Sequence, residues 1–315
     1  MQVHRDINNL PIIKNAVITI GTFDGVHTGH LQIIDQLNET AKKVKGESVI
    51  ITFHPHPRMI IISDKSEIKL LNTVEEKIEL LSNHKVDHLV VIPFTKEFAE
   101  QSAEEYIRGF LVKTFHPHTI ITGYDHHFGK NRTGNYKLLE SYSREFNYKV
   151  KEIPEHVLNQ VIISSTKIRN AILQGDIETA NKYLGYPYFF EGTVVEGDKI
   201  GRTIGYPTAN ITVEDENKLI PGDGIYAVEL AIDRQSNTLY KGMLSIGERP
   251  TIENSKRVIE VNIFNFNENI YQQHIRIFIK KYFREQKKFT GLQQLKTAIE
   301  LDKKNIINYF ADDQV

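Results

Sequence analysis

The ten residues GTFDGVHTGH at positions 21–30 constrain the fold of this chain more than any other segment. They follow an apolar run at 16–20 that has the character of a buried parallel strand. The apolar residues after them recur at the spacing of a helix: Leu31, Ile34, Leu37, Ala41 and Val44. The segment is therefore predicted to be a strand-to-helix turn. Such a turn offers backbone N–H groups and the positive end of a helix dipole to an anion.

Two histidines lie in this turn, at His27 and His30. Their spacing places them on one face if the first helical turn begins there. A single histidine at a helix start is most often a solvated or capping residue, whereas a pair in a glycine-bracketed turn favours a functional role. We expect both to donate hydrogen bonds to phosphate oxygens. The glycines of the turn, which let the backbone approach a ligand closely, are Gly21, Gly25 and Gly29.

Length and composition bound what the chain can be. Its 315 residues suggest about two domains, and a formal net charge of −1 gives no overall attraction to nucleic acid or acidic membranes. The absence of cysteine excludes disulfides, thiolate metal sites and cysteine nucleophiles, and it fits a reducing compartment. No apolar run has the length of a signal sequence or a membrane span, so we expect a cytoplasmic protein without nucleic-acid or membrane partners.

The first half of the sequence alternates predicted strands with predicted helices, and this pattern indicates a doubly wound parallel α/β sheet. The predicted strands are 16–20, 48–53, 87–92, 119–122 and 148–153. Two helix starts have the capping-box pattern, at Thr73–Glu76 and Ser102–Glu105. In such sheets ligands bind outside the carboxyl ends of the strands.

Polar and glycine-rich segments follow four of these strands, so they are predicted to converge on one edge of the sheet. After the opening turn come HPHP at 54–57, GYDHHFGKNRTG at 123–134 and ISSTKIR at 163–169. The last of these opens a helix with hydroxyls and a guanidinium, namely Ser164, Ser165, Thr166 and Arg169. An arginine fork binds a multi-oxygen anion bidentately. Because the set contains no evident nucleophile–base pair, it indicates nucleotide binding and charge stabilisation in phosphoryl or nucleotidyl transfer.

The other paired histidines are weaker signals. The HPH segment at 54–56 fits a proline-ended strand as well as a functional site. The HPH segment at 116–118 precedes a strand, at the wrong edge of the sheet, and is interpreted as structural. The HH pair at 126–127 has no partner ligands at metal-site spacing, so a metal site there is rejected.

Beyond Gly185, short strands with turns between them predict a small antiparallel β-barrel or sandwich with a C-terminal helix. The predicted strands are 188–195, 224–232, 238–246, 257–264 and 274–283. The helix is predicted to start at Thr290, capped with Gln293. Its expected buried stripe is Leu292, Leu295, Ile299 and Ile306. The boundary at Gly185 gives two domains, 1–185 and 186–315.

A glycine-rich segment at 197–210, GDKIGRTIGYPTAN, carries the candidate site of the second half. Its first part resembles a Walker loop but is one residue short and has Arg202 where lysine is required, so a different phosphate loop is predicted. The PTAN residues are expected to fix a turn and to supply Thr208 and Asn210 as neutral oxygen ligands for Mg²⁺. Glu260 lies on the more polar face of a predicted strand, where it is either solvated or a general base for transfer to a hydroxyl.

Together these segments resemble the bifunctional bacterial riboflavin kinase/FMN adenylyltransferase (FAD synthetase) family over nearly the whole chain. The opening turn, TFHPHP, GYDHHFGKNRTG and ISSTKIR resemble its adenylyltransferase module, which implies a nucleotidyltransferase-like sheet. GRTIGYPTANI at 201–211, IGERPT at 246–251, Glu260 and REQKKF at 284–289 resemble its kinase module. Eight motifs in order across two modules make the resemblance highly specific.

The resemblance implies two reactions. The kinase module transfers the γ-phosphate of ATP to riboflavin, giving FMN, and the N-terminal module joins AMP from a second ATP to FMN, giving FAD and pyrophosphate. It also implies that His27 and His30 hold the ATP phosphates and that Arg169 helps to bind the nucleotide. Glu260 would take the hydroxyl proton, with Thr208 and Asn210 binding Mg²⁺ and phosphate. The other residues implied to bind substrate or nucleotide are Gly21, Phe23, Asp24, Gly25, Gly29, Phe53, Asp125, Arg132, Ser164, Ser165, Thr166, Gly201, Arg202, Gly205, Pro207 and Arg284.

Three residues depart from the family pattern, with His126 in place of an aromatic, Ser245 in place of asparagine and Asn265 in place of aspartate. We expect neither activity to be abolished by them. Three other interpretations stay open: only one module is active, the protein is a non-catalytic flavin sensor, or the first module serves another acceptor such as phosphopantetheine or a sugar phosphate. The PTAN motif and Glu260 argue against a silent barrel. The sequence indicates no oligomeric state.

Overall fold

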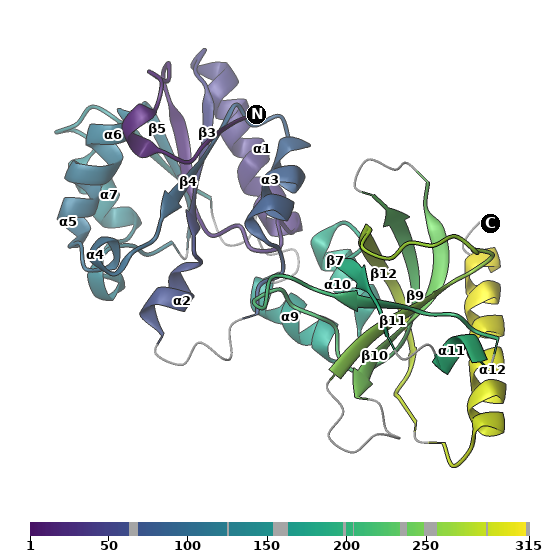
Figure 1. Cartoon of the computed structure of the whole chain (residues 1–315). Coiled ribbons are helices and arrows are strands. Elements are labelled where there is room, and N and C mark those ends of the chain that lie inside the picture. Colours follow the sequence, from purple (N-terminus) through teal and green to yellow (C-terminus); the bar gives the residue numbers. More distant parts are fainter. Residues whose placement is uncertain are drawn as a thin grey trace. The chain divides into compact units, whose positions relative to one another are not determined.

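In a computed structural model of the chain, the backbone contacts define two compact units, residues 1–165 and 166–315 (Figure 1). The residues described are 1–62, 69–124, 126–153, 163–197, 200–203, 205–233, 238–248, 257–287 and 289–312. By this division into two units, the helices α9 (Ser165–Leu173) and α10 (Ile177–Leu184) belong almost entirely to the second unit. Gly185, where the sequence places the domain boundary, ends α10 in the left-handed conformation.

The first unit is built on a six-stranded parallel sheet with the order β1-β4-β3-β2-β5-β6. Its strands are β1 (Gln2–His4), β2 (Val17–Ile20), β3 (Ser48–His54), β4 (His88–Pro93), β5 (Thr119–Gly123) and β6 (Lys149–Ile153). All five predicted strands are confirmed, and so is the parallel, doubly wound sheet. The sequence does not predict β1, because three residues carry no readable alternation. β1 extends one edge of the sheet by pairing with β4.

Two apolar layers flank this sheet, because successive strand residues face opposite sides. On one side α1 (Thr28–Lys43) and α3 (Val74–Ser82) pack against the strands. The predicted helical spacing after the opening turn is confirmed, since Ile34, Leu37 and Ala41 of α1 are buried there. The shorter helices that follow α3 cover the other side, as Figure 1 shows.

Each of these helices is short, with three to seven residues. They are α4 (Lys96–Ala99), α5 (Ala103–Glu105), the π-helix η3 (Tyr106–Val112), α6 (Lys113–Phe115) and α7 (Tyr136–Tyr142). Also described are α2 (Pro57–Ile61) and the 3-10 turns η1 (Ile7–Asn9) and η4 (Lys130–Arg132). Both predicted capping boxes are confirmed, at Thr73–Glu76 and Ser102–Glu105. The helix that begins after Ser102 continues as the π-helix η3, whose apolar face is buried at Tyr106, Ile107, Phe110 and Leu111.

The second unit contains a closed barrel in which every pairing is antiparallel, in the order β10-β11-β8-β7-β12-β9. Its strands are β7 (Phe189–Val195), β8 (Ala209–Thr212), β9 (Gly224–Ile232), β10 (Tyr240–Glu248), β11 (Arg257–Ile263) and β12 (His274–Arg284). The sequence predicts all of these except β8. The expectation that PTAN forms a turn is wrong for Ala209 and Asn210, which pair with Val261 and Glu260. Pro207 precedes the strand, so its missing N–H does not interrupt the ladder.

A long helix, α12 (Leu292–Asp312), lies against the barrel (Figure 1). The start predicted at Thr290 with Gln293 as its cap is wrong, because the Thr290 hydroxyl donates to Gln294 Oε1 instead (2.9 Å). The predicted buried stripe is correct at its far end and wrong at Leu292, which is 62% exposed because it lies in the first turn.

An ion pair fastens α12 to the barrel. The Arg284 guanidinium at the end of β12 donates through Nε and Nη2 to the two carboxylate oxygens of Asp302 on α12, at 2.9 and 2.6 Å. Asp302 is buried, so the pair is shielded from water and the bidentate geometry fixes the helix direction. Among the helices of the described ranges, none is long and apolar enough to cross a membrane.

Two buried tyrosine hydroxyls test whether the units unfold separately. Tyr148 donates to the Leu139 carbonyl in the first unit (2.7 Å), and Tyr188 donates to the Leu219 carbonyl in the second (2.5 Å). Changing either residue to phenylalanine leaves a buried carbonyl unpaired, so we expect a loss of about 1–2 kcal/mol in free energy of unfolding. In calorimetry of the full chain, Tyr148→Phe should lower one transition and Tyr188→Phe the other, each by about 2–6 °C. One transition lowered by both variants would contradict independent units.

Candidate active sites

The predicted strand-to-helix turn is confirmed, and its backbone is held in strained conformations. It leaves β2 with the Gly21 N–H donating to the Ile51 carbonyl of β3 (3.0 Å). Before α1 begins, Phe23, Gly25 and Val26 have φ angles of 48°, 92° and 37°. Left-handed conformations are costly for residues with a side chain, so the surroundings must hold the turn in this shape.

His27 and His30 cap α1 for one another. The Nδ1 atom of His27 accepts the His30 backbone N–H (3.3 Å), and the Nδ1 atom of His30 accepts the His27 backbone N–H (3.2 Å). Their rings stack with centroids 3.7 Å apart, so the prediction that they share a face is confirmed. Because both Nδ1 atoms accept hydrogen bonds, each neutral ring carries its proton on Nε2. Each histidine therefore keeps one N–H donor for a ligand.

Burial keeps both of these rings neutral. It lowers the pKa of His27 to about 4, opposed by attraction to the Asp24 carboxylate. Burial also lowers the pKa of His30 well below its ordinary value, and repulsion from His27 and Lys77 acts in the same direction. At neutral pH the pair supplies hydrogen-bond donors and no positive charge of its own.

Asp24 and Ser165 shape the turn. A buried Asp24 carboxylate oxygen accepts the backbone N–H groups of Leu71 (2.9 Å) and Asn72 (3.3 Å), just before α3. The Asp24 carbonyl accepts the Ser165 hydroxyl at the start of α9 (2.8 Å). The structure thus brings these two predicted site residues together, with Asp24 facing the protein backbone.

Lys77 is a site residue that sequence reasoning missed. It lies on α3, is 6% exposed, and donates from Nζ to the carbonyl of Thr22 in the turn (2.6 Å). Burial lowers the pKa of Lys77 to about 8, opposed by the Asp24 carboxylate. A lysine just inside an amphipathic helix ordinarily faces solvent, so the sequence held no signal for this position.

The remaining predicted residues of the first site are spread over several elements. Phe53 is the last residue but one of β3 and lies within the core, with its ring 5.4 Å from Phe94 and 5.6 Å from Phe98. Arg132 is exposed and has a φ of 58°. Asp125 lies outside the described residues.

The first turns of α9 carry the other three. Ser164 directly precedes the helix, Thr166 is exposed and Arg169 is half-buried. Assignment of these side chains to the nucleotide stays a prediction.

A row of rings runs beside GYDHHFG. Tyr106 stacks on Phe128 with centroids 4.9 Å apart, and Phe128 stacks on His126 at 5.8 Å. Tyr106 and Phe128 are buried, whereas His126 is half-buried. The departure from the family pattern at His126 therefore keeps a planar stacking ring in place.

The HPH segments have capping and strand-start roles. His56 accepts the Arg58 backbone N–H at the start of α2 (3.2 Å). At the other segment the His118 N–H donates to the Ala16 carbonyl (2.8 Å), and its ring is bonded to the Thr119 hydroxyl (2.8 Å). The structural interpretation of 116–118 is confirmed.

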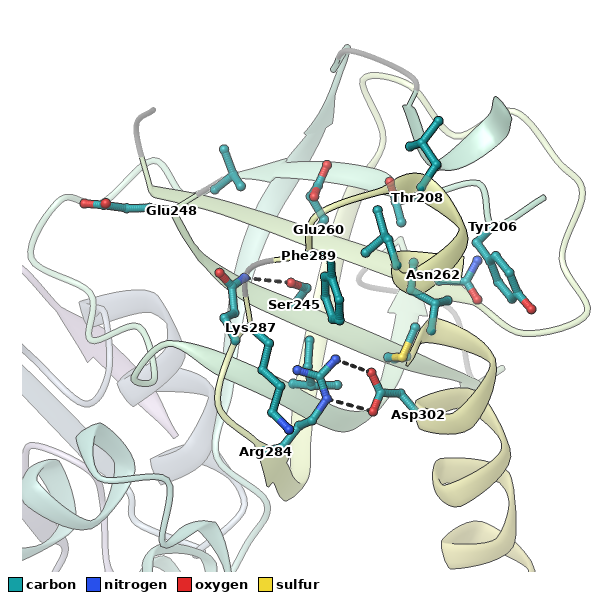
Figure 2. Close-up of a pocket in the computed structure, with 18 of the residues that line it drawn as sticks. Tyr206, Thr208, Ser245, Glu248, Glu260, Asn262, Arg284, Lys287, Phe289 and Asp302 are labelled. Atoms are coloured by element: carbon teal, nitrogen blue, oxygen red, sulfur yellow. Dashed lines mark hydrogen bonds and ion pairs between the residues drawn. The ribbon is translucent and has the colours of Figure 1, made fainter. Parts of the chain in front are cut away.

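The barrel and α12 line a cavity of about 440 Å³ (Figure 2). Such a volume falls in the range of small-molecule sites. Figure 2 shows Glu260 and Thr208 at one end of the cavity and the paired Arg284 at the other, with Ser245 and Phe289 between them.

Three polar residues form a row across neighbouring strands of this barrel. Ser245 of β10 is directly opposite Glu260 of β11, and Glu260 is directly opposite Asn210 of β8. Opposite residues of an antiparallel pair point to the same face. Thr208, just before β8, lines the same cavity as Glu260. The structure thus brings the predicted base together with the two predicted metal ligands, and the polar face of β11 turns toward the cavity.

The glycine-rich segment before β8 forms a short helix, α11 (Ile200–Thr203), and a tight turn. The Tyr206 N–H donates to the Gly201 carbonyl (2.8 Å), and Gly205 has a φ of 87°. Arg202 is exposed. A four-residue helix followed by a strand differs from a Walker loop, which opens a long helix, as the sequence predicted.

Asn262 is the second functional residue that the sequence did not single out. It follows Glu260 by two positions on the same face of β11, and its Nδ2 donates to the carbonyl of Pro207 (2.6 Å). Its Oδ1 is buried without a hydrogen-bond partner in the described part of the chain. Gly197 packs directly against the side chain of Asn210, since a Cβ at position 197 would lie 2.1 Å from Asn210 Nδ2. These contacts fix the PTAN backbone against β11.

Arg284 lines the cavity, but its fork is directed at Asp302. Its third nitrogen, Nη1, donates to the Glu285 carbonyl (2.7 Å). Two residues further along, Gln286 Nε2 donates to the Ser245 hydroxyl (3.0 Å). Serine at position 245, which departs from the family pattern, therefore still makes a hydrogen bond in the cavity lining. The observed contacts of Arg284 shape the site, and its role toward substrate stays a prediction.

The oxygen donors at this end of the cavity suit a hard divalent ion. Thr208, Asn210 and Glu260 offer a hydroxyl, an amide oxygen and a carboxylate, which are the ligand types that Mg²⁺ accepts. Within the described ranges no three His, Cys, Asp or Glu side chains form a ready metal cage.

Comparisons with known families divide the chain in a similar way. A family model described as FAD synthetase matches residues 10–167, and one described as riboflavin kinase matches residues 184–310. The residues between the two matches lie in α9, in α10 and in the turn that joins them.

Individual relatives match along nearly the full length. A bifunctional riboflavin kinase/FMN adenylyltransferase of Buchnera aphidicola subsp. Schizaphis graminum is 38% identical, over 98% of this chain and 99% of that protein. One from Listeria monocytogenes is 36% identical, over 94% and 93%. A crystal structure described as a macrolide-efflux protein from Streptococcus pneumoniae has a TM-score of 0.86, 30% identity and 98% coverage of both chains.

The neutral state of the buried histidine pair predicts how the stability of the first unit changes as pH falls. Because the pKa of His27 is about 4 in the folded chain and its ordinary value is 6.5, the unfolded chain binds protons first as pH falls. Stability is therefore full above pH 6.5 and decreases between pH 6.5 and 4, by about 3 kcal/mol for a shift of this size.

His27→Asn is expected to weaken this dependence, leaving the part that comes from His30, while keeping stability at pH 7, since asparagine is a strong helix N-cap that does not titrate. The measurement is the calorimetric transition of the first unit, identified with Tyr148→Phe, at pH 7, 6, 5 and 4. An unchanged pH dependence in the variant would contradict the assignment.

Proposed function

The chain belongs to the bifunctional riboflavin kinase/FMN adenylyltransferase family, and we propose that each of its units carries one complete active site. The second unit phosphorylates riboflavin with ATP to give FMN. The first unit joins AMP from a second ATP to FMN, giving FAD and pyrophosphate. The observation that carries the proposal is the cross-strand row that sets Glu260 beside Asn210 at the barrel cavity, remote in sequence from the anion-binding turn at 21–30.

The kinase step needs a base because its acceptor is an alcohol. The Glu260 carboxylate accepts the proton of the terminal ribityl hydroxyl while that oxygen bonds to the γ-phosphorus of ATP and the bond to ADP breaks. Thr208 and Asn210, next to Glu260, orient the γ-phosphate. The apolar wall that includes Phe289 and Leu295 accepts the flavin ring system.

Thr208 and Asn210 are the residues that would hold Mg²⁺, as their oxygen donors and position suggest. Bound there together with ATP, Mg²⁺ would supply positive charge that offsets the negative charge of the phosphates. The Asn262 bond to the Pro207 carbonyl keeps both ligands in register with Glu260.

The adenylyl-transfer step needs no strong base, because the FMN phosphate is already ionised near neutral pH. A phosphate oxygen of FMN bonds to the α-phosphorus of ATP, and the bond to pyrophosphate breaks. The Nε2–H groups of His27 and His30 donate to the phosphate oxygens, supported by the dipole of α1. The half-buried ring of His126 provides a stacking surface for a planar flavin.

Two substitutions separate the reactions. Glu260→Gln is expected to lower the rate of FMN formation by about 10²–10⁴ while FAD formation from supplied FMN persists, because only the alcohol acceptor needs the base. His30→Ala is expected to do the reverse, so that FMN accumulates from riboflavin. Products are separated chromatographically after incubation with riboflavin, ATP and Mg²⁺, and with FMN and ATP.

The matched control for the first variant is Glu229→Gln, because Glu229 lies on another barrel strand, in an ion pair with Lys280 (3.2 Å), away from the cavity lining. It should leave both activities unchanged. Equal loss of both reactions in Glu260→Gln, or normal FAD formation by His30→Ala, would refute the assignment of sites.

The hydrogen bond from Asn262 to the Pro207 carbonyl, which acts as a tether between β11 and the PTAN segment, gives a further test of the kinase site. Asn262→Leu, of similar volume, removes the donor to Pro207 and also a buried acceptor without a partner, so stability should change by less than about 1 kcal/mol. FMN formation is nevertheless expected to fall about tenfold, since a small misplacement of Thr208 and Asn210 disturbs phosphate alignment. Kinase kcat and thermal unfolding are measured together. Full activity in a stably folded variant would show that the tether has no role.

A further inference from the structure

Lys77 is buried and contacts the opening turn from α3, and the two reactions do not explain this contact. Lys77 is 6% exposed on α3, and burying an ammonium group is costly unless it is paired and hydrogen-bonded. Yet no acidic side chain in the described chain lies within ion-pair distance of its Nζ. The strongest partner of Nζ is instead a backbone carbonyl, that of Thr22 (2.6 Å).

This one carbonyl receives two side-chain donors. The hydroxyl of Thr52, on β3, donates to the Thr22 carbonyl at 3.2 Å, and Lys77 Nζ also approaches the same hydroxyl at 3.5 Å. Thr52 is fully buried. Two donors from different elements, β3 and α3, therefore fix the direction of a single peptide group in the turn.

The direction of that peptide group decides where its N–H points. The peptide bond between Thr22 and Phe23 is trans, so its C=O and N–H point in opposite directions. With the carbonyl drawn toward Lys77 and Thr52, the Phe23 N–H points away from β3 and α3. In the part of the chain that the structure describes, no backbone or side-chain acceptor takes this N–H.

The residue that carries this N–H lies next to the histidine pair. The Phe23 ring lies 5.0 Å from the His30 ring, and His30 stacks on His27. Burial keeps both histidines neutral. Lys77, whose Nζ contacts the Thr22 carbonyl of the turn, has a pKa of about 8 and is therefore mostly charged at pH 7.

We propose that Lys77 is a positioning residue for adenylyl transfer, which holds the Thr22 carbonyl inward so that the Phe23 N–H faces the phosphates of ATP. Lys77 itself touches no substrate. Its effect passes through one peptide group, in the way that preorganised backbone donors stabilise developing charge. The inference rests on the proposed adenylyltransferase function of the first unit.

Lys77→Met is the main test, because methionine has a similar length and no donor. Loss of a single oriented donor should lower kcat/KM for ATP in FAD formation by about 10–100-fold. The KM for FMN should not change. Thermal unfolding of the first unit should be unchanged or shifted upward, because replacing a buried charge with an apolar side chain is often neutral or stabilising.

Thr52 supplies a second test that does not depend on how well Lys77→Met folds. Thr52→Val removes the hydroxyl donor to the same carbonyl with little change in volume, and we expect about a threefold loss in kcat/KM for ATP. Thr52→Ser keeps the hydroxyl and should retain native kinetics. Lys43→Met, at a side chain 74% exposed on α1, is the control for loss of a lysine and should change neither reaction.

Each outcome decides the matter. A lowered kcat/KM for ATP in FAD formation by both Lys77→Met and Thr52→Val, with stability retained and phosphorylation of riboflavin to FMN intact, supports the proposal. Native kinetics in Thr52→Val, or a loss in Lys77→Met only in proportion to a lowered unfolding temperature, overturns it. If the native chain made no FAD from FMN and ATP, the proposed function of the first unit would fail instead.

Discussion

The antiparallel register of β11 between β8 and β10 is the constraint on which the barrel site depends. It sets Glu260 opposite Asn210 on one side and Ser245 on the other. Side chains alternate faces along a strand, so a slip of one residue would turn Glu260 away from the cavity and bring Ile259 or Val261 to it. Closure of the barrel and the Arg284–Asp302 pair resist such a slip, because each strand is paired on both sides and α12 is fixed to the end of β12.

The first unit solves a different physical problem. Its acceptor is a charged phosphate, so the site must supply donors in fixed directions rather than a base. The turn achieves this with left-handed backbone at Phe23 and Val26, which surrounding contacts hold in place. Asp24 binds the chain before α3, and the two histidines close the start of α1. Neutral imidazoles, each with its proton on Nε2, are donors that do not repel one another when stacked.

Much of this architecture could be predicted from residue patterns. The strands of the sheet are read from apolar runs, and both capping boxes from the spacing of Thr73 and Ser102 with their glutamates. Strand β8 could not be read, because four residues after a proline carry the pattern of a turn. Its existence depends on pairing with β7 on one side and with β11, which is distant in sequence, on the other.

The site residues that the sequence missed share one property. Lys77 and Asn262 each act on a backbone carbonyl more than 50 positions away, at Thr22 and Pro207. Local periodicity cannot indicate such a contact, since it depends on which elements pack together. The charge state of His27 and His30 was likewise not readable, because it depends on how far the fold buries them. Motifs therefore locate the chemistry, while the contacts that orient it come from the tertiary fold.

The central claim is that two complete and separable sites lie in one chain. It is tested most directly by mixing the Glu260→Gln and His30→Ala proteins in one reaction with riboflavin, ATP and Mg²⁺, and following flavins over time. The account predicts that neither protein alone forms FAD at an appreciable rate, and that the mixture forms FAD after a lag, as FMN released by one protein is adenylylated by the other. A mixture that forms no FAD, although both proteins are folded, would contradict it.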